Sequence, residues 1–209
     1  MSIRYGVLLI PEPSFTARAY RARQLICGQY GSWAAEMHML HLTVAGYFQC
    51  PDSAIDTLGE GLGEIAEDIR QRTPQFPLSH RGVAPLPDAA GNIVVDFSGS
   101  QSTGVLHNLH RDVIGLLGRT PGATLEMEHA GDNYWPHISL MQYATHVSEV
   151  FADAMEFARD VVADLQLPAS TRAWRLLLVR FRSEAAGNDW TGGRWAADLS
   201  WETLSSYSL

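Results

Sequence analysis

The sequence contains no lysine, so all 15 of its basic residues are arginines. The chain has 23 acidic residues, and its net charge at pH 7 is -8. A protein that tracks long nucleic acid usually carries a basic face, because neutralisation of phosphates dominates such binding. The charge therefore argues against a long polyanionic partner. Arginine is nevertheless well suited to a local contact with a single phosphate group.

Cysteine and long apolar runs are also scarce. Only Cys27 and Cys50 occur, without a C-x-x-C pair, which excludes a disulfide framework and a zinc ribbon. The longest apolar runs, such as residues 7–10, are far shorter than the ~20 residues of a membrane span. The apolar stretch at the N-terminus is too short for a secretory signal. We therefore expect one globular domain, residues 1–209, in the cytoplasm and without a membrane partner.

The order of apolar patterns predicts the fold class. Because i, i+3, i+4 spacing marks helices and short apolar or alternating runs mark strands, the elements alternate along the chain. The resulting order is βα-βα-ββα-ββα-ββ, which predicts an α+β protein with mainly antiparallel sheets. We expect strands over 4–10, 38–48, 75–85, 92–98, 123–129, 136–143, 173–182 and 194–201, and helices over 13–27, 53–69, 103–117 and 147–165.

Two tripeptides occupy matching predicted strands, one in each half of the chain. One runs from His41 to Thr43 and the other from His137 to Ser139. Since residues i and i+2 of a strand project from the same face, each imidazole lies beside a hydroxyl, and the intervening leucine or isoleucine faces the core. About one His-x-Ser/Thr is expected by chance, and a third stands at a predicted helix start, residues 146–148. The strand context raises the first two above chance, with two buried structural histidines as the alternative.

These motifs resemble the signature of the two-histidine (2H) phosphoesterases, in particular the 2'-5' RNA ligase-like branch. The resemblance covers most of the chain, including the opening YGVLLIPEP, HLTVAGYF, the segment FPLSHRGVAPLPDAAGNIVVDF and PHISL. It implies a bilobal fold of two pseudo-symmetric lobes around a central cleft, each lobe with one motif. It also implies a phosphodiesterase that acts on 2',3'-cyclic phosphates or 2'-5' linkages of nucleotides or RNA ends, or performs the reverse ligation. No metal or cofactor is required.

The residue types suit that reaction. Histidine titrates near neutral pH, so one neutral and one protonated imidazole can serve as general base and general acid. The hydroxyls of Thr43 and Ser139 can bond to the phosphoryl oxygens on which charge accumulates. His41 and His137 can each take either role, and the sequence does not decide between them.

Aromatic and basic residues near the motifs are candidate substrate contacts. An aromatic ring can stack on a base, and an arginine can bind a phosphate, although packing and solvated surfaces are the alternatives. The candidates are Tyr47, Tyr134, Trp135, Tyr143, Arg81 and Arg180.

Two other functions stay open. A non-catalytic module of the same fold would bind a nucleotide or RNA end, although it has no need of two imidazoles. A metal-dependent hydrolase would use His107 and His110, which are three residues apart on a predicted helix, but the sequence offers no third ligand and favours a solvated face.

His38 is three residues from His41 on one predicted strand, so the two rings are expected to face opposite ways. The P-loop, dinucleotide-binding and nucleophile-elbow signatures are absent.

Overall fold

The computed structural model describes residues 1–87, 90–125, 133–190 and 192–209. Within these ranges no helix is long and apolar enough to cross a membrane. The helices are α1 (Pro13–Tyr30), α2 (Ile55–Arg72), α3 (Ser100–Arg119) and α4 (Ser148–Asp164). The strands are β1 (Ser2–Pro11), β2 (Leu42–Gln49), β3 (Pro77–Ser79), β4 (Val83–Pro85), β5 (Ile93–Asp96), β6 (Thr124–Leu125), β7 (His137–Met141), β8 (Ser170–Ser183) and β9 (Ser200–Ser208).

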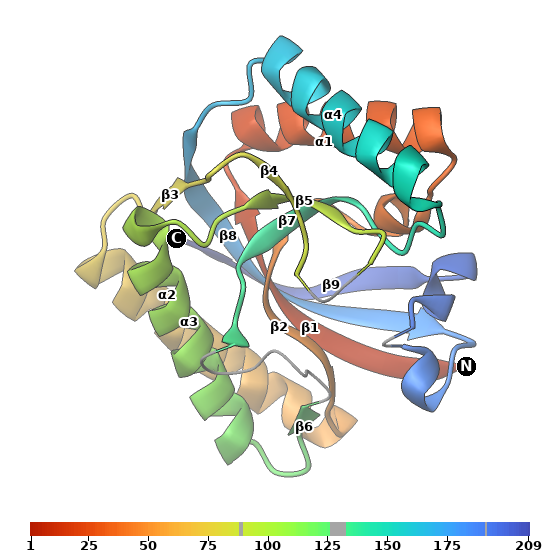
Figure 1. Cartoon of the computed structure of the whole chain (residues 1–209). Helices are drawn as coiled ribbons and strands as arrows, with labels where there is room; N and C mark the ends of the chain where they lie inside the picture. Colours follow the sequence, from red (N-terminus) through yellow and green to blue (C-terminus); the bar gives the residue numbers. More distant parts are fainter. Residues whose placement is uncertain (88–89, 126–132, 191) are drawn as a thin grey trace.

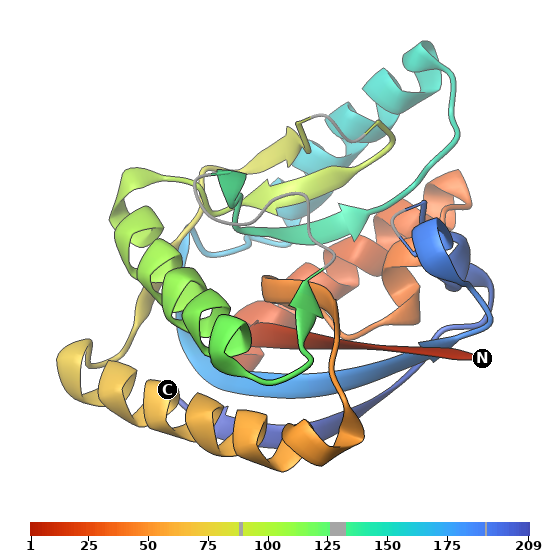
Figure 2. The ribbon, with the colours of Figure 1, turned by 90° about the horizontal axis from the view of Figure 1, so that it is seen from below.

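The described strands form two antiparallel sheets (Figure 1). The larger sheet has the order β3-β8-β1-β2-β6, with β9 also paired to β8, and the smaller has the order β4-β5-β7. α1 and α4 pack together beside the smaller sheet, whereas α2 and α3 pack together against the larger one (Figures 1 and 2). The predicted α+β class with antiparallel sheets is confirmed.

Apolar spacing explains which faces are buried. On α2 the side chains of Leu58, Leu62 and Ile69 are buried, at intervals that keep them on one side of the helix. The apolar run of β1 is buried almost throughout, because its alternate side chains enter apolar clusters on both faces of the larger sheet.

A second, smaller apolar cluster lies apart from the main core. Its buried members are Leu8, Val179, Phe181, Trp190, Trp195 and Leu199. Trp190 and Trp195 come from the connection between β8 and β9. We call residues 184–190 and 192–199 of this connection the tryptophan segment.

Four predicted strands differ from the structure, two of them in the N-terminal half. The strand expected over 38–48 begins only at Leu42, because a 3-10 helix (Ala34–Met37) and a bend at Leu40 precede it. The segment 75–85 divides into β3 and β4, which belong to different sheets. The chain turns between them at Gly82, whose φ of +99° favours glycine.

The remaining differences lie nearer the C-terminal half. Of the strand expected over 194–201, residues Arg194–Ala197 form a 3-10 helix and β9 begins at Ser200. Of the strand expected over 123–129, Thr124–Leu125 form β6, and residues 126–129 lie outside the described part of the chain.

Candidate active site

His41 stands immediately before β2 with its ring held by its own backbone. Its Nδ1–H donates to the carbonyl of Met39 at 2.7 Å, and its Nε2 lies 3.2 Å from the hydroxyl of Thr43. Leu42, between the two, is fully buried, whereas His41 and Thr43 are partly exposed. The motif therefore has the predicted arrangement, with imidazole and hydroxyl side by side.

His137 repeats this geometry at the start of β7. Its Nδ1–H donates to the carbonyl of Trp135 at 2.8 Å, again two residues earlier in the chain. Ile138 is fully buried, and Ser139 is partly exposed beside the imidazole. Because a carbonyl oxygen can only accept a hydrogen bond, both rings carry a proton on Nδ1. Nε2 is then the nitrogen that can exchange a proton with a substrate.

The fold brings the two motifs together. β2 and β7 belong to different sheets, yet they are in contact. The pKa of His41 lies well below its usual range, first because the surrounding protein removes the ring from much of the solvent, then because His38 is near, with a further lowering from His137. His41 is therefore neutral at pH 7.

Tyr134 links the second motif to the first. It is buried, and its hydroxyl donates to the carbonyl of Thr43 at 2.9 Å. On the next residue of β2, the carbonyl of Val44 accepts from Nδ1–H of His110 at 2.7 Å. The rings of His110 and Tyr134 stack with their centroids 4.1 Å apart. Two buried side chains thus hold the backbone of β2 at the first motif.

The interpretation of His107 and His110 as a solvated pair is wrong. His110 is 2% exposed, and His107 packs with its ring centroid 5.3 Å from that of Tyr134. Burial lowers the pKa of His110. Among the residues that the structure describes, no three His, Cys, Asp or Glu side chains are grouped so that they could hold a metal ion.

Arg81 and Trp135 both meet β5 beside the second motif. Asp96 of β5 is the cross-strand partner of His137. Its side chain accepts from the indole nitrogen of Trp135 at 2.9 Å, and its carbonyl accepts from the backbone nitrogen of Arg81 at 2.7 Å. The side chain of Arg81 is exposed. Both residues are therefore near His137.

Tyr47 and Tyr143 occupy equivalent positions, each six residues after a motif histidine. Both have the positive φ that non-glycine residues rarely adopt, +30° and +52°. Both rings pack on Trp195, with centroid distances of 6.0 Å and 5.8 Å. Gly193 lies so close to Tyr143 that an added Cβ would stand 2.6 Å from its ring. The tryptophan segment thus joins the two motif strands.

Arg180 does not belong to this site. Thr43 is paired with Leu8 of β1, a member of the smaller apolar cluster, whereas Arg180 is paired with Tyr5 on the opposite face of the sheet. Its guanidinium forms an ion pair with Glu202 of β9. The prediction that Arg180 contacts the substrate is wrong, because the alternation of β8 directs it away from the motifs.

His38 is the residue that sequence reasoning missed. Its ring meets that of His41 with centroids 4.9 Å apart, so the two do not face opposite ways. The prediction failed because residues 38–41 are not part of a regular strand. The 3-10 helix before it and the bend at Leu40 return His38 to the side of His41.

The hollow of about 550 Å³ along α2 is a poor alternative site. Its lining contains Glu60, Glu64, Glu67 and Asp68 but neither histidine nor arginine. Four carboxylates would repel a phosphate group.

We expect Tyr134→Phe to lower the free energy of unfolding by about 1–2 kcal/mol, because the buried carbonyl of Thr43 loses its donor. Denaturant unfolding measures this change. Tyr20→Phe is the matched control, since Tyr20 is on the exposed side of α1. Equal stability of Tyr134→Phe and wild type would contradict the role assigned to this hydroxyl.

Comparison with known proteins identifies the family. A family model described as the 2'-5' RNA ligase superfamily matches residues 11–184. The apo structure of E. coli LigT is similar, with a TM-score of 0.58 and 14% sequence identity over 99% of this chain and 96% of LigT. A structure described as a phosphoesterase has a TM-score of 0.52 and 12% identity over 100% of this chain and 99% of its own. No curated protein matches the sequence.

The chain belongs to the 2'-5' RNA ligase superfamily, since the family model covers most of its length. It is therefore of the two-histidine phosphoesterase class, as the resemblance of its motifs predicts. The likeness to LigT confirms the fold over nearly the whole chain.

Proposed function

We propose that this protein is a phosphodiesterase that acts on 2',3'-cyclic phosphates or 2'-5' linkages of nucleotides or RNA ends. The observation that supports this most is the matched pair of imidazoles. His41 and His137 each donate Nδ1–H to a carbonyl two residues earlier and each have a hydroxyl two residues later. The relatives support the substrate class, because LigT has been solved with 3'-AMP and with phosphate.

In the proposed reaction, water attacks phosphorus while one bond between phosphorus and a ribose oxygen breaks. One histidine takes a proton from the water through Nε2, and the other gives a proton to the leaving oxygen. The lowered pKa of His41 favours the neutral form that a base requires, so we assign it as the base and His137 as the acid. In the reverse direction a ribose hydroxyl would attack phosphorus and water would leave, which would form a 2'-5' linkage.

Side chains around the pair have proposed supporting roles. Thr43 and Ser139 donate to the non-bridging phosphoryl oxygens. Arg81 and Trp135 are near His137 and are our candidates for contacts with phosphate and base. Tyr134 holds β2 rather than the substrate, because its hydroxyl already donates to the backbone. Tyr47 and Tyr143 form the boundary of the site with Trp195.

We expect the purified protein to hydrolyse 2',3'-cyclic AMP in excess EDTA, because the proposed acid–base pair needs no metal ion. Chromatography of the nucleotide products measures the rate, and 2'-5'-linked diadenosine monophosphate is the second substrate. Activity that is lost in EDTA and restored by added metal would contradict the mechanism.

A non-catalytic binding module is the second candidate function. Titration calorimetry with 3'-AMP separates it from the enzyme, since a module would bind the nucleotide while the cyclic substrate stays intact. Such a result would overturn the proposed activity and retain the fold assignment.

A further inference from the structure

His38 shares a hydrogen-bond acceptor with His41. Its Nδ1 lies 3.1 Å from the carbonyl of Met39, which also accepts from Nδ1–H of His41 at 2.7 Å. The ring of His38 is 6% exposed and meets the ring of His41 at 66°, edge to face. Rotation of the His41 ring away from its present plane is therefore blocked on one side by His38.

His38 is itself held from both halves of the chain. Its Nε2 lies 3.0 Å from Oε1 of the Gln142 side-chain amide, directly after β7, and a half-turn of that amide would place its NH2 group there instead. An amide has both donors and an acceptor, so it can satisfy either neutral tautomer of the imidazole. On the other side, Arg23 of α1 donates to the carbonyl of His38 at 2.9 Å and pairs with Glu36 at 3.0 Å. Arg23 is 1% exposed, so this is a buried and fixed anchor.

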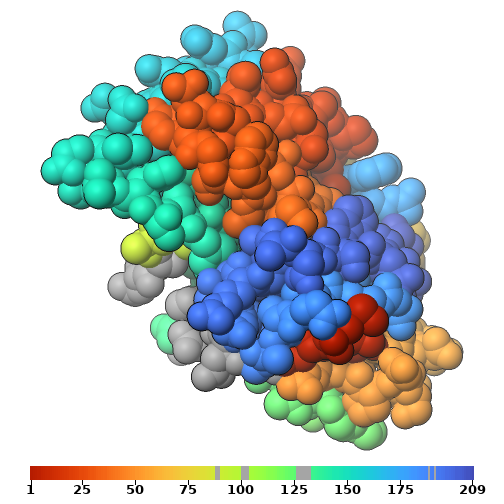
Figure 3. Space-filling view, turned by 90° about the vertical axis from the view of Figure 1, so that its right-hand side faces the viewer, coloured from red at the N-terminus to blue at the C-terminus, as the bar shows by residue number. Residues whose placement is uncertain are grey.

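The tryptophan segment closes the remaining side. The ring centroid of Trp195 is 5.6 Å from that of His38, and its indole nitrogen donates to the carbonyl of Trp190 at 3.0 Å. In the space-filling view this segment (blue) lies against the surface formed by the residues that precede β2 (orange) (Figure 3).

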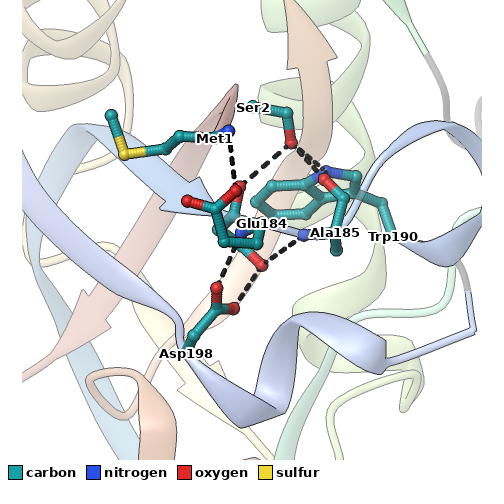
Figure 4. Close-up of polar contacts among 7 residues, drawn as sticks. Met1, Ser2, Glu184, Ala185, Trp190 and Asp198 are labelled. Carbon is teal, nitrogen blue, oxygen red and sulfur yellow. Dashed lines mark hydrogen bonds and ion pairs between the residues drawn. The ribbon is translucent and has the colours of Figure 1, made fainter.

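Polar contacts attach the tryptophan segment to the larger sheet. Trp190 donates from its indole nitrogen to the hydroxyl of Ser2 at 2.9 Å and to the carbonyl of Ala185 at 3.0 Å (Figure 4). Asp198 accepts from the backbone nitrogen of Glu184 at 2.7 Å and from the hydroxyl of Ser183 at 2.5 Å. These bonds hold the tryptophan segment in place, so Trp195 packs against His38 in a fixed position.

We propose that His38 is a positioning residue, which orients the imidazole of His41 and ties the first motif to the end of the second motif strand through Gln142. The proposal rests on the proposed function of His41. With Met39 accepting from Nδ1–H and His38 against the ring, Nε2 of His41 keeps its direction toward Thr43. Gln142 directly follows β7, the strand that begins with His137. Its bond to His38 therefore holds the ring of His41 in a fixed position relative to the second motif strand.

Positive charge near the two rings lowers their pKa values. Arg23 of α1 acts on both rings and His137 of β7 acts on His41, whereas Glu36 before β2 forms an ion pair with Arg23. Burial, followed by the charge of Arg23, lowers the pKa of His38, so this ring is neutral at pH 7. A proton on His38 would place a second positive charge beside His41 and lower the pKa of His41 further. Removal of His38 is therefore expected to raise the pKa of His41.

The test compares His38→Asn and Gln142→Leu with wild type on 2',3'-cyclic AMP. We expect kcat to fall about 10- to 100-fold in His38→Asn with KM nearly unchanged, since a displaced reacting group affects the chemical step. Gln142 is partly exposed, and Gln142→Leu removes its hydrogen bond to His38 while His38 stays in place. We expect this variant to have a lower kcat as well. His146→Asn and Gln71→Leu are the controls, and we expect both to retain wild-type kcat.

Nitrogen-15 NMR of the imidazoles gives a readout that a merely structural role would not change. In His38→Asn we expect His41 to titrate at higher pH and to lose its fixed Nδ1–H tautomer. Wild-type kcat and an unchanged titration of His41 in the folded variants would overturn the proposal. If His38→Asn does not fold, Gln142→Leu decides by the same two measurements.

The same design separates this proposal from the proposed function. If wild type hydrolyses neither cyclic nor 2'-5'-linked substrates, the proposed function fails. The NMR titration still decides whether His38 orients His41.

Discussion

We expect His41→Ala and His137→Ala each to lower kcat by about 10²–10⁴-fold or more, because each removes one half of a general acid–base pair. The rate of 2',3'-cyclic AMP hydrolysis in excess EDTA measures the loss. The double variant should be little slower than either single one, since the two groups act in one step. Losses that simply multiply would indicate that the imidazoles act independently.

His146→Ala is the control for the loss of an imidazole. Its ring packs on that of Tyr30 of α1, with the centroids 6.1 Å apart, and it stands two residues before α4. We expect wild-type turnover from this variant. Wild-type turnover in His41→Ala would instead show that the assignment of the base is wrong.

The pH profile of the wild-type enzyme follows from the same pair. A general base acts in its neutral form, and burial together with His38 holds the pKa of His41 well below its usual range. As pH falls from 7, activity should therefore persist until the lowered pKa of His41 is reached. If the pH profile is bell-shaped, its two apparent pKa values describe the coupled pair of histidines rather than His41 or His137 alone.

We expect Thr43→Ala and Ser139→Ala to lower kcat by about 10²–10³-fold, which is the usual effect of removing one donor to a developing oxyanion. Thr43→Ala has a second effect, because its hydroxyl lies 3.2 Å from Nε2 of His41 and helps to set its direction. KM should change less than kcat, since the charge on the phosphoryl oxygens increases only in the transition state.

The conservative changes Thr43→Ser and Ser139→Thr keep a hydroxyl at each position and should restore most of the activity. Thr57→Ala on the exposed side of α2 is the control for the loss of a threonine hydroxyl. If both serine–threonine exchanges are as slow as the alanine variants, shape rather than a hydrogen bond determines the role of these side chains.

The sequence by itself determined the fold class and the two motifs. Local periodicity depends on residues within a few positions of each other, so the strand, helix and antiparallel hairpin patterns were readable without any distant contact. The same rule placed His41 beside Thr43 and His137 beside Ser139, with Leu42 in the core. The family assignment followed from those residues.

Only the tertiary structure decided which distant side chains meet the motifs. Arg180 lies on the face of the larger sheet opposite to Thr43, and this follows from the pairing of β8 and β2 with β1, which the local periodicity did not predict. His110 is buried because Tyr134 and the carbonyl of Val44 cover it, and both come from other elements. These contacts join residues far apart in sequence, so a local sequence pattern cannot predict them.

His38 shows the same limit at short range. Three residues separate it from His41, and an extended chain would direct the two rings apart. The 3-10 helix and the bend at Leu40 reverse that expectation, and they form where Arg23, Gln142 and Trp195 enclose the segment. The local sequence favours a strand, but the hydrogen bonds from Arg23 and Gln142 and the ring contact with Trp195 favour the bend, and in the folded protein these contacts prevail.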